Sequence, residues 1–89
     1  MFVIEDEVHT EWLAPRFDTR DEALAELRRI ASVPWMTPPN RPPCSFAASC
    51  RRSYELVEYD TSVGPTWREL TREPVLEVSA EGVRWLGVP

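Results

Sequence analysis

The stretch that decides the fold is TRDEALAELRRIA, residues 19–31. Thr19 followed by Glu22 forms a capping box, in which each side chain can bind the other residue's backbone amide. Apolar residues recur behind it at helical spacing, at Ala23, Leu24, Leu27, Ile30 and Ala31. A residue before proline avoids the α region, so the helix must end at Val33-Pro34. The sequence therefore predicts one amphipathic helix that begins at Thr19.

Five short segments rich in β-forming residues flank this helix. They occupy residues 2–8, 9–14, 54–59, 75–79 and 83–86. Pro15 indicates that the second segment lies at a sheet edge or ends early. Gly82 fits the tight turn between the last two segments, because glycine tolerates a positive φ. Residues 66–72 repeat the capping-box pattern, which predicts a short helical turn before Pro74.

The order of these elements predicts the fold class. A β-β-α-β-β-β chain with one short helical turn is typical of an α+β fold. We expect an antiparallel sheet of about five strands, with the one main helix packed on one face. A chain of 89 residues is long enough for a single domain, residues 1–89.

Composition narrows the function classes. The net charge of −5 argues against bulk nucleic-acid binding, which normally needs a basic domain. We expect no membrane association, because no apolar run approaches the roughly 20 residues of a membrane span. The first residues are acidic and therefore unlike a secretory signal. A cytoplasmic location follows as the expectation.

The basic residues are concentrated in the middle of the chain. Residues 27–54 carry five arginines and no acidic residue. These are Arg28, Arg29, Arg41, Arg51 and Arg52. Two interpretations stay open: the arginines pair with the acidic flanks, or they form an anion-binding face.

Residues 34–52 form a proline-rich, cysteine-containing segment that predicts a long loop. Five prolines fall within residues 34–43, so neither a helix nor a central strand is expected there. Residues 45–49 could form a short turn of helix. Of the four tryptophans we expect at least two to be buried, and Trp35 to be exposed near Arg41 as part of a partner surface.

Cys44 and Cys50 are separated by five residues. Zinc sites usually pair cysteines at spacings of two to four, so we expect no metal and no cofactor. A local disulfide and two free, half-buried thiols both remain open. Arg51 and Arg52 follow Cys50 and could activate its thiol or bind an anion. His9 is the single histidine, and we expect it to be solvated in a turn.

Residues 12–23, WLAPRFDTRDEA, resemble a pattern of small bacterial domains of unknown function, in which a strand ends in an aromatic residue and Thr and Glu-Ala open a helix. HicB-type antitoxins share this arrangement. The chain departs from that family in lacking a glycine-containing turn before the helix. The resemblance implies an antitoxin-like regulator.

Three functions follow as hypotheses. The first is a non-catalytic interaction module that binds a protein partner or a second copy of the chain. Its candidate surface comprises Trp35, Arg41, Cys44, Cys50, Arg51 and Arg52. The second is a small thiol-dependent enzyme or anion-binding site at the two cysteines, with Arg51 and Arg52 as anion ligands. The third is the antitoxin-like regulator.

Overall fold

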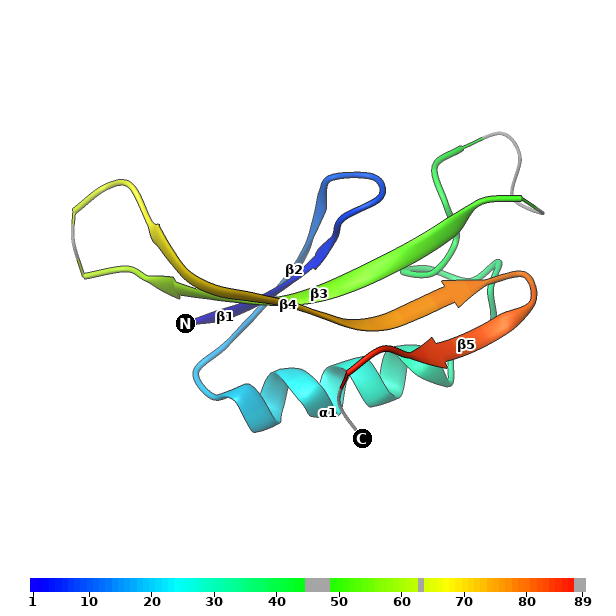
Figure 1. Cartoon of the computed structure of the whole chain (residues 1–89), viewed down its shortest axis with the longest axis horizontal. Helices are drawn as coiled ribbons and strands as arrows, with labels where there is room; N and C mark the ends of the chain where they lie inside the picture. The colour runs from blue at the N-terminus through cyan, green and yellow to red at the C-terminus, as the bar shows by residue number, and fades with distance from the viewer. Residues whose placement is uncertain (45–48, 63, 88–89) are drawn as a thin grey trace.

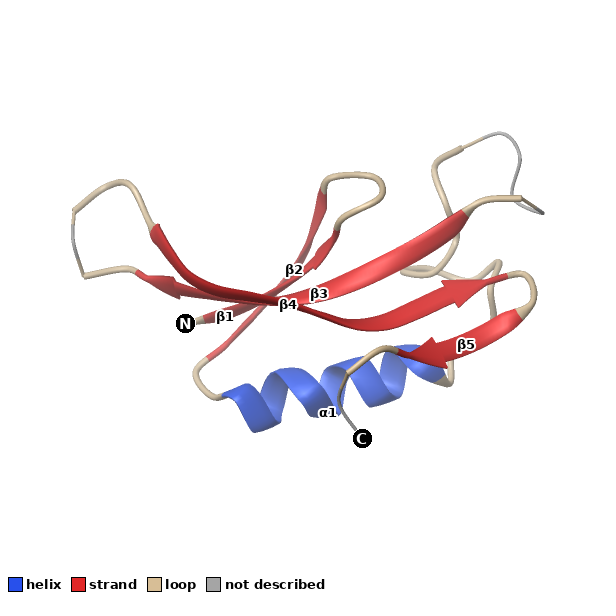
Figure 2. Ribbon diagram, in the orientation of Figure 1, coloured by secondary structure: helices blue, strands red, loops and turns tan. Residues whose placement is uncertain are grey.

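A computed structural model describes residues 1–44, 49–62 and 64–87 (Figure 1). Its elements are β1 (Phe2–Asp6), β2 (Glu11–Phe17), α1 (Arg20–Ala31), β3 (Arg51–Asp60), β4 (Arg68–Ser79) and β5 (Gly82–Trp85). Within these residues the strands form one antiparallel sheet in the order β2-β1-β3-β4-β5, shown in red in Figure 2. The α+β class is confirmed, since the residues that the structure describes contain one helix and an antiparallel five-stranded sheet.

Helix α1 begins as the sequence predicts. The Thr19 hydroxyl accepts from the Glu22 amide at 3.2 Å, and the Glu22 carboxylate accepts from the Thr19 amide at 3.2 Å. Acidic residues lie in its first turn and arginines in its last, where they complement the helix dipole. The capping box and the amphipathic pattern therefore form the helix that the sequence indicates.

The main core lies between α1 and the sheet. Its buried members are Ile4, Ala23, Leu24, Leu27, Ile30, Tyr54, Leu56, Val75, Leu76 and Val78. Successive side chains of a strand point to opposite faces, so neighbours of these residues form a second, smaller cluster. That cluster contains Val3, Val57 and Tyr59, with Met1 and Trp67 packed against it.

The C-terminal hairpin is also confirmed. β4 pairs with β5 from Leu76 opposite Trp85 to Ser79 opposite Gly82, and Gly82 has a φ of 125°. β2 is an edge strand that contains Pro15, as the proline indicates.

The predicted helical turn over residues 66–72 is wrong. β4 begins at Arg68 and pairs with β3 from Arg68 opposite Asp60. Pro74 lies where the register shifts between Tyr54 and Glu55, a position that tolerates proline. Pairing along the whole of β3 therefore overrides the local capping-box pattern.

Three further expectations change. β1 ends at Asp6 rather than at residue 8, and residues 7–10 form the turn to β2. β3 begins at Arg51, so the predicted 34–52 loop loses its last two residues to the sheet. None of the four tryptophans is fully buried, because the core is filled by aliphatic residues and Tyr54.

The helical turn expected at residues 45–49 falls mostly on residues 45–48, which lie outside the described residues. Among the residues that are described, no helix is long and apolar enough to cross a membrane.

Candidate functional site

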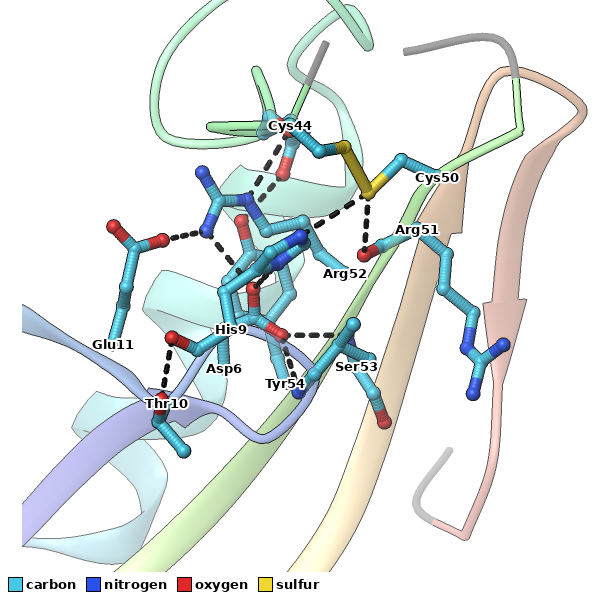
Figure 3. Close-up of polar contacts among 12 residues, drawn as sticks. Asp6, His9, Thr10, Glu11, Cys44, Cys50, Arg51, Arg52, Ser53 and Tyr54 are labelled. Carbon is cyan, nitrogen blue, oxygen red and sulfur yellow. Dashed lines mark hydrogen bonds and ion pairs between the residues drawn. A yellow bond between two sulfur atoms is a disulfide. The ribbon is translucent and has the colours of Figure 1, made fainter. Parts of the chain in front are cut away.

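The pairing of β1 with β3 assembles a polar cluster from three separate parts of the chain (Figure 3). Asp6, the last residue of β1, lies opposite Tyr54 near the start of β3. The turn after β1 supplies His9, and the segment leading into β3 supplies Cys50. Residues far apart in sequence thus meet at one end of two central strands.

Asp6 is the centre of this cluster and is fully buried. Its Oδ1 accepts hydrogen bonds from the amides of Ser53 at 3.0 Å and Val8 at 3.1 Å. Its Oδ2 accepts from Arg52 Nη1 at 2.9 Å and from His9 Nδ1 at 2.5 Å. These four donors satisfy the Asp6 carboxylate, whose burial without hydrogen-bond partners would cost free energy.

His9 connects Asp6 to the cysteines. A carboxylate only accepts hydrogen bonds, so Nδ1 of His9 carries the proton that Asp6 receives. The other ring nitrogen, Nε2, lies 3.1 Å from Sγ of Cys50. The His9 side chain is only 13% exposed, so the expectation of a solvated turn histidine is wrong. Asp6 sets the ring orientation and turns Nε2 toward the sulfur.

Cys44 and Cys50 form a disulfide. The structure thus has the local cross-link in place of two free thiols. Both residues are half-buried, so the pair is neither enclosed in the core nor fully open to solvent. Cys44, Cys50 and His9 each present one ligand atom, and the three atoms lie within 4.8 Å of one another. The disulfide therefore holds the loop beside His9, the single histidine.

Arg52 is buried and directs its donors into the chain. Nη1 binds Asp6 and also Glu11, while Nε and Nη2 donate to the backbone carbonyls of Asn40 at 3.3 Å and Arg41 at 2.5 Å. Burial alone would lower the pKa of Arg52, but hydrogen bonds to Glu11 and Asp6 raise it above the ordinary value. Arg52 is therefore a structural cation that links the loop to β1 and β2.

A second buried contact holds the proline-rich segment. Asn40 is fully buried, and its Nδ2 donates to the carbonyls of Ile30 at 3.0 Å and Val33 at 2.9 Å. Its Oδ1 accepts from the Tyr54 hydroxyl at 2.9 Å. Burial raises the pKa of Tyr54 above its ordinary value. The loop is thus attached to the end of α1 and to β3.

The structure does not bring the predicted surface residues together on one exposed patch. Trp35 is half-buried and packs against the main core, whereas Arg41 is exposed. Arg51 projects from β3 and pairs with Glu77 on β4 at 3.8 Å. Of the five arginines in the basic stretch, Arg29 also pairs, with Glu26 at 2.7 Å. Ion pairing with acidic residues therefore accounts for three of the five, counting Arg52.

Sequence reasoning missed Asp6 as a site residue and assigned His9 to solvent. One local signal was present, because Asp6 accepts from the amide two residues on, as an aspartate that initiates a turn does. The contacts to Ser53 and Cys50 had no such signal, since they depend on the register between β1 and β3.

Comparisons of the chain with models of known protein families, with characterised proteins and with solved structures gave no match. The resemblance to HicB-type antitoxins therefore stays a prediction, and function must be argued from the site itself. Its chemical resources are a disulfide, an imidazole beside one of the sulfurs, and a buried carboxylate behind the imidazole. That set fits thiol–disulfide chemistry.

Proposed function

We propose that the protein is a thiol–disulfide exchange protein whose Cys44–Cys50 pair cycles between disulfide and dithiol. The observation that carries this proposal is the position of His9 between Asp6 and Cys50. A structural cross-link has no need of an imidazole aimed at one of its sulfurs. Exchange does need one, because the departing thiolate must be stabilised and protonated.

In the proposed step the reductant is a dithiol. One of its thiolates attacks Sγ of Cys44, the Cys44–Cys50 bond breaks, and Cys50 leaves with the electron pair. Protonated His9 gives its Nε2 proton to the Cys50 sulfur, while Asp6 keeps the ring in place. The second thiol of the reductant then gives its proton to water and attacks the mixed disulfide as a thiolate, releasing Cys44, which takes a proton from water. Two electrons pass from the reductant to the cysteine pair, and the reverse sequence oxidises a dithiol.

The test is the rate at which the oxidised protein is reduced by dithiothreitol. Samples are quenched with an alkylating reagent and the modified thiols are counted by mass spectrometry. We expect His9→Gln to slow reduction roughly 10-fold to 100-fold, because a positioned proton donor is removed. Glu7→Gln is the matched control, since Glu7 is an exposed residue of the same turn. Equal rates for wild type and His9→Gln would contradict the proposal.

A second measurement separates exchange from cross-linking. The oxidised fraction is determined in glutathione buffers of defined ratio. An exchange-active pair equilibrates within the range of known oxidoreductases, about −120 to −270 mV. A pair that stays oxidised down to about −300 mV would be a structural disulfide, and the proposal would be wrong.

A second candidate is the non-catalytic interaction module, with its surface moved from the 34–52 loop to an aromatic cluster. Trp12 is 55% exposed on edge strand β2 and stacks on Trp67, with ring centroids 5.8 Å apart. Tyr59 lies against both rings, and the Arg16 guanidinium sits 4.7 Å from the Trp67 centroid. Exposed tryptophan beside arginine is typical of interaction hot spots.

The partner that we propose for this cluster is a second copy of the chain. Sedimentation velocity over a concentration series provides the test. We expect self-association that is lost in the Trp12→Ala, Trp67→Ala double variant and kept in Trp85→Ala, which alters an exposed tryptophan on the opposite edge strand. A wild-type chain that stays monomeric throughout would exclude this candidate.

A further inference from the structure

The geometry points to a Zn²⁺ site in the reduced protein, formed by Nε2 of His9 and the thiolates of Cys44 and Cys50. This inference rests on the proposed function in one respect, that the Cys44–Cys50 bond can be reduced. Spacing within the sequence argued against zinc, because five residues separate the cysteines. The fold supplies the third ligand from the turn after β1.

Distances between the donor atoms suit one ion. The three ligand atoms lie within 4.8 Å of one another, and Nε2 of His9 is 3.1 Å from Sγ of Cys50. Tetrahedral zinc with Zn–S bonds of about 2.3 Å and Zn–N bonds of about 2.0 Å needs its donors about 3.5–3.8 Å apart. Reduction of the disulfide frees the two sulfurs to separate by that amount. Only small side-chain movements are therefore required.

Asp6 supplies the outer support that zinc-binding histidines use. A metal-bound histidine almost always donates its other ring N–H to a carboxylate, a carbonyl or water. Nδ1 of His9 is 2.5 Å from the buried Oδ2 of Asp6, and Ser53 and Arg52 bind the same carboxylate. The ring is thus already oriented with Nε2 toward the sulfurs, before any metal binds.

Charge also balances at this site. Two thiolates neutralise one Zn²⁺, and the Asp6 carboxylate is compensated by Arg52 at 2.9 Å. Binding converts two thiols and one Zn²⁺ into a dithiolate complex and releases two protons. Three protein ligands leave a fourth position for water. The oxidised pair has no thiolates to offer, so the disulfide and the metal are alternative occupants of the same site.

The test uses full-length protein reduced with a phosphine and kept anaerobic, with Co²⁺ as the spectroscopic probe. We expect one Co²⁺ per chain, thiolate-to-cobalt charge-transfer absorption, the strong visible bands of tetrahedral cobalt, and displacement by Zn²⁺. The disulfide form should give none of these signals. His9→Gln, Cys44→Ser and Cys50→Ser should each abolish the tetrahedral bands.

Positioning by Asp6 is tested separately. Asp6→Asn should weaken Zn²⁺ binding about 10-fold to 100-fold, as loss of an outer-shell partner does. Glu7→Gln, which alters the adjacent carboxylate, should leave the affinity unchanged. Circular dichroism identifies any variant that has not folded, and the inference is then judged on the cysteine and His9 variants alone.

Each outcome has a distinct meaning. Reduced wild-type protein without tetrahedral bands, or bands that persist in His9→Gln, would overturn the zinc site. Because the phosphine reduces the protein without thiol exchange, such a failure leaves the exchange rates of His9→Gln to support or refute the proposed function independently. A disulfide that even the phosphine cannot reduce would overturn both.

Discussion

Nε2 of His9 lies 3.1 Å from Sγ of Cys50, although 41 positions separate the two residues in the chain. The contact exists because β1 ends where β3 begins, and Asp6 then orients the ring. The same few residues stabilise the fold and form the candidate site. We therefore expect substitutions of the buried residues to lower the free energy of unfolding strongly, and substitutions of the exposed residues to lower it little.

Asp6→Asn should reduce the free energy of unfolding by about 3–5 kcal/mol, because it leaves the buried Arg52 charge without its buried partner. Urea denaturation monitored by circular dichroism measures the loss. The matched control is Glu11→Gln, which removes the other carboxylate on the same guanidinium. Glu11 is 47% exposed, so its loss should cost at most about 1 kcal/mol. Equal costs for the two variants would contradict the role given to burial.

Asn40→Ala should cost about 2 kcal/mol, because it removes the buried hydrogen bonds to Ile30, Val33 and Tyr54. The Ile30 carbonyl still accepts from the Val33 amide and the Tyr54 hydroxyl can still donate to Pro39, so the Val33 carbonyl is the group that loses its donor. Tyr54→Phe should cost less, about 1 kcal/mol, since it removes one hydroxyl donor, which is shared between Asn40 and Pro39. Chemical denaturation of both single variants and the double variant gives the coupling. A strictly additive double variant would show that the Asn40–Tyr54 hydrogen bond contributes nothing.

Tyr54 and Tyr59 should each ionise at a higher pH than free tyrosine does. Burial, together with a hydrogen bond to Glu5, raises the pKa of Tyr59 to about 12, and burial raises the pKa of Tyr54. Since the unfolded pKa is about 10, the folded state keeps its protons while the unfolded state loses them. Stability is therefore complete below about pH 10 and falls as the pH rises toward the folded pKa values.

Ultraviolet absorbance of the phenolate, with urea denaturation at matched pH values, checks this dependence. The Tyr59→Phe variant should lose less stability between neutral pH and about pH 11 than the wild type. A folded protein in which either tyrosine ionises near pH 10 would contradict the expected shift for that residue.

Thr19→Ala should cost about 1 kcal/mol through loss of the helix N-cap. The backbone amide at position 19 remains and can still donate to the Glu22 carboxylate, so Glu22→Ala tests the other half of the capping box and should cost less. Thermal denaturation measures both. Thr61→Ala provides a control at an exposed threonine outside the helices and strands and should be nearly neutral. A neutral Thr19→Ala would mean that packing alone maintains the start of α1.

Local patterns succeeded wherever the deciding interactions are themselves local. The capping box at Thr19 joins residues three apart, and the turn at Gly82 joins adjacent strands. The identical pattern at Thr66 failed, because residues 68–72 pair with β3 over a long range. A capping box contributes about 1 kcal/mol, which a continuous ladder of strand hydrogen bonds exceeds.

In the candidate site, too, the sequence identified some residues but not the contacts that long-range pairing creates. The two cysteines and the single histidine could be recognised from the sequence, and a disulfide was one of the alternatives that their spacing left open. The contact between them could not be recognised from the sequence. Nor could the burial of Arg52, for which the sequence left open either an ion pair with the acidic flanks or a place in an anion-binding face. The exposure of Trp12 and its stacking on the half-buried Trp67 had no sequence signal either.

By itself the sequence determined the helix, the C-terminal hairpin and the α+β class, because hydrogen bonds and apolar spacing within a few residues produce them. Only the tertiary structure decided that His9, Asp6 and Cys50 form one cluster. The physical reason is strand register: a shift of β1 against β3 would move Asp6 away from Ser53 and Arg52, and His9 would lose the carboxylate that aims it at the cysteine pair.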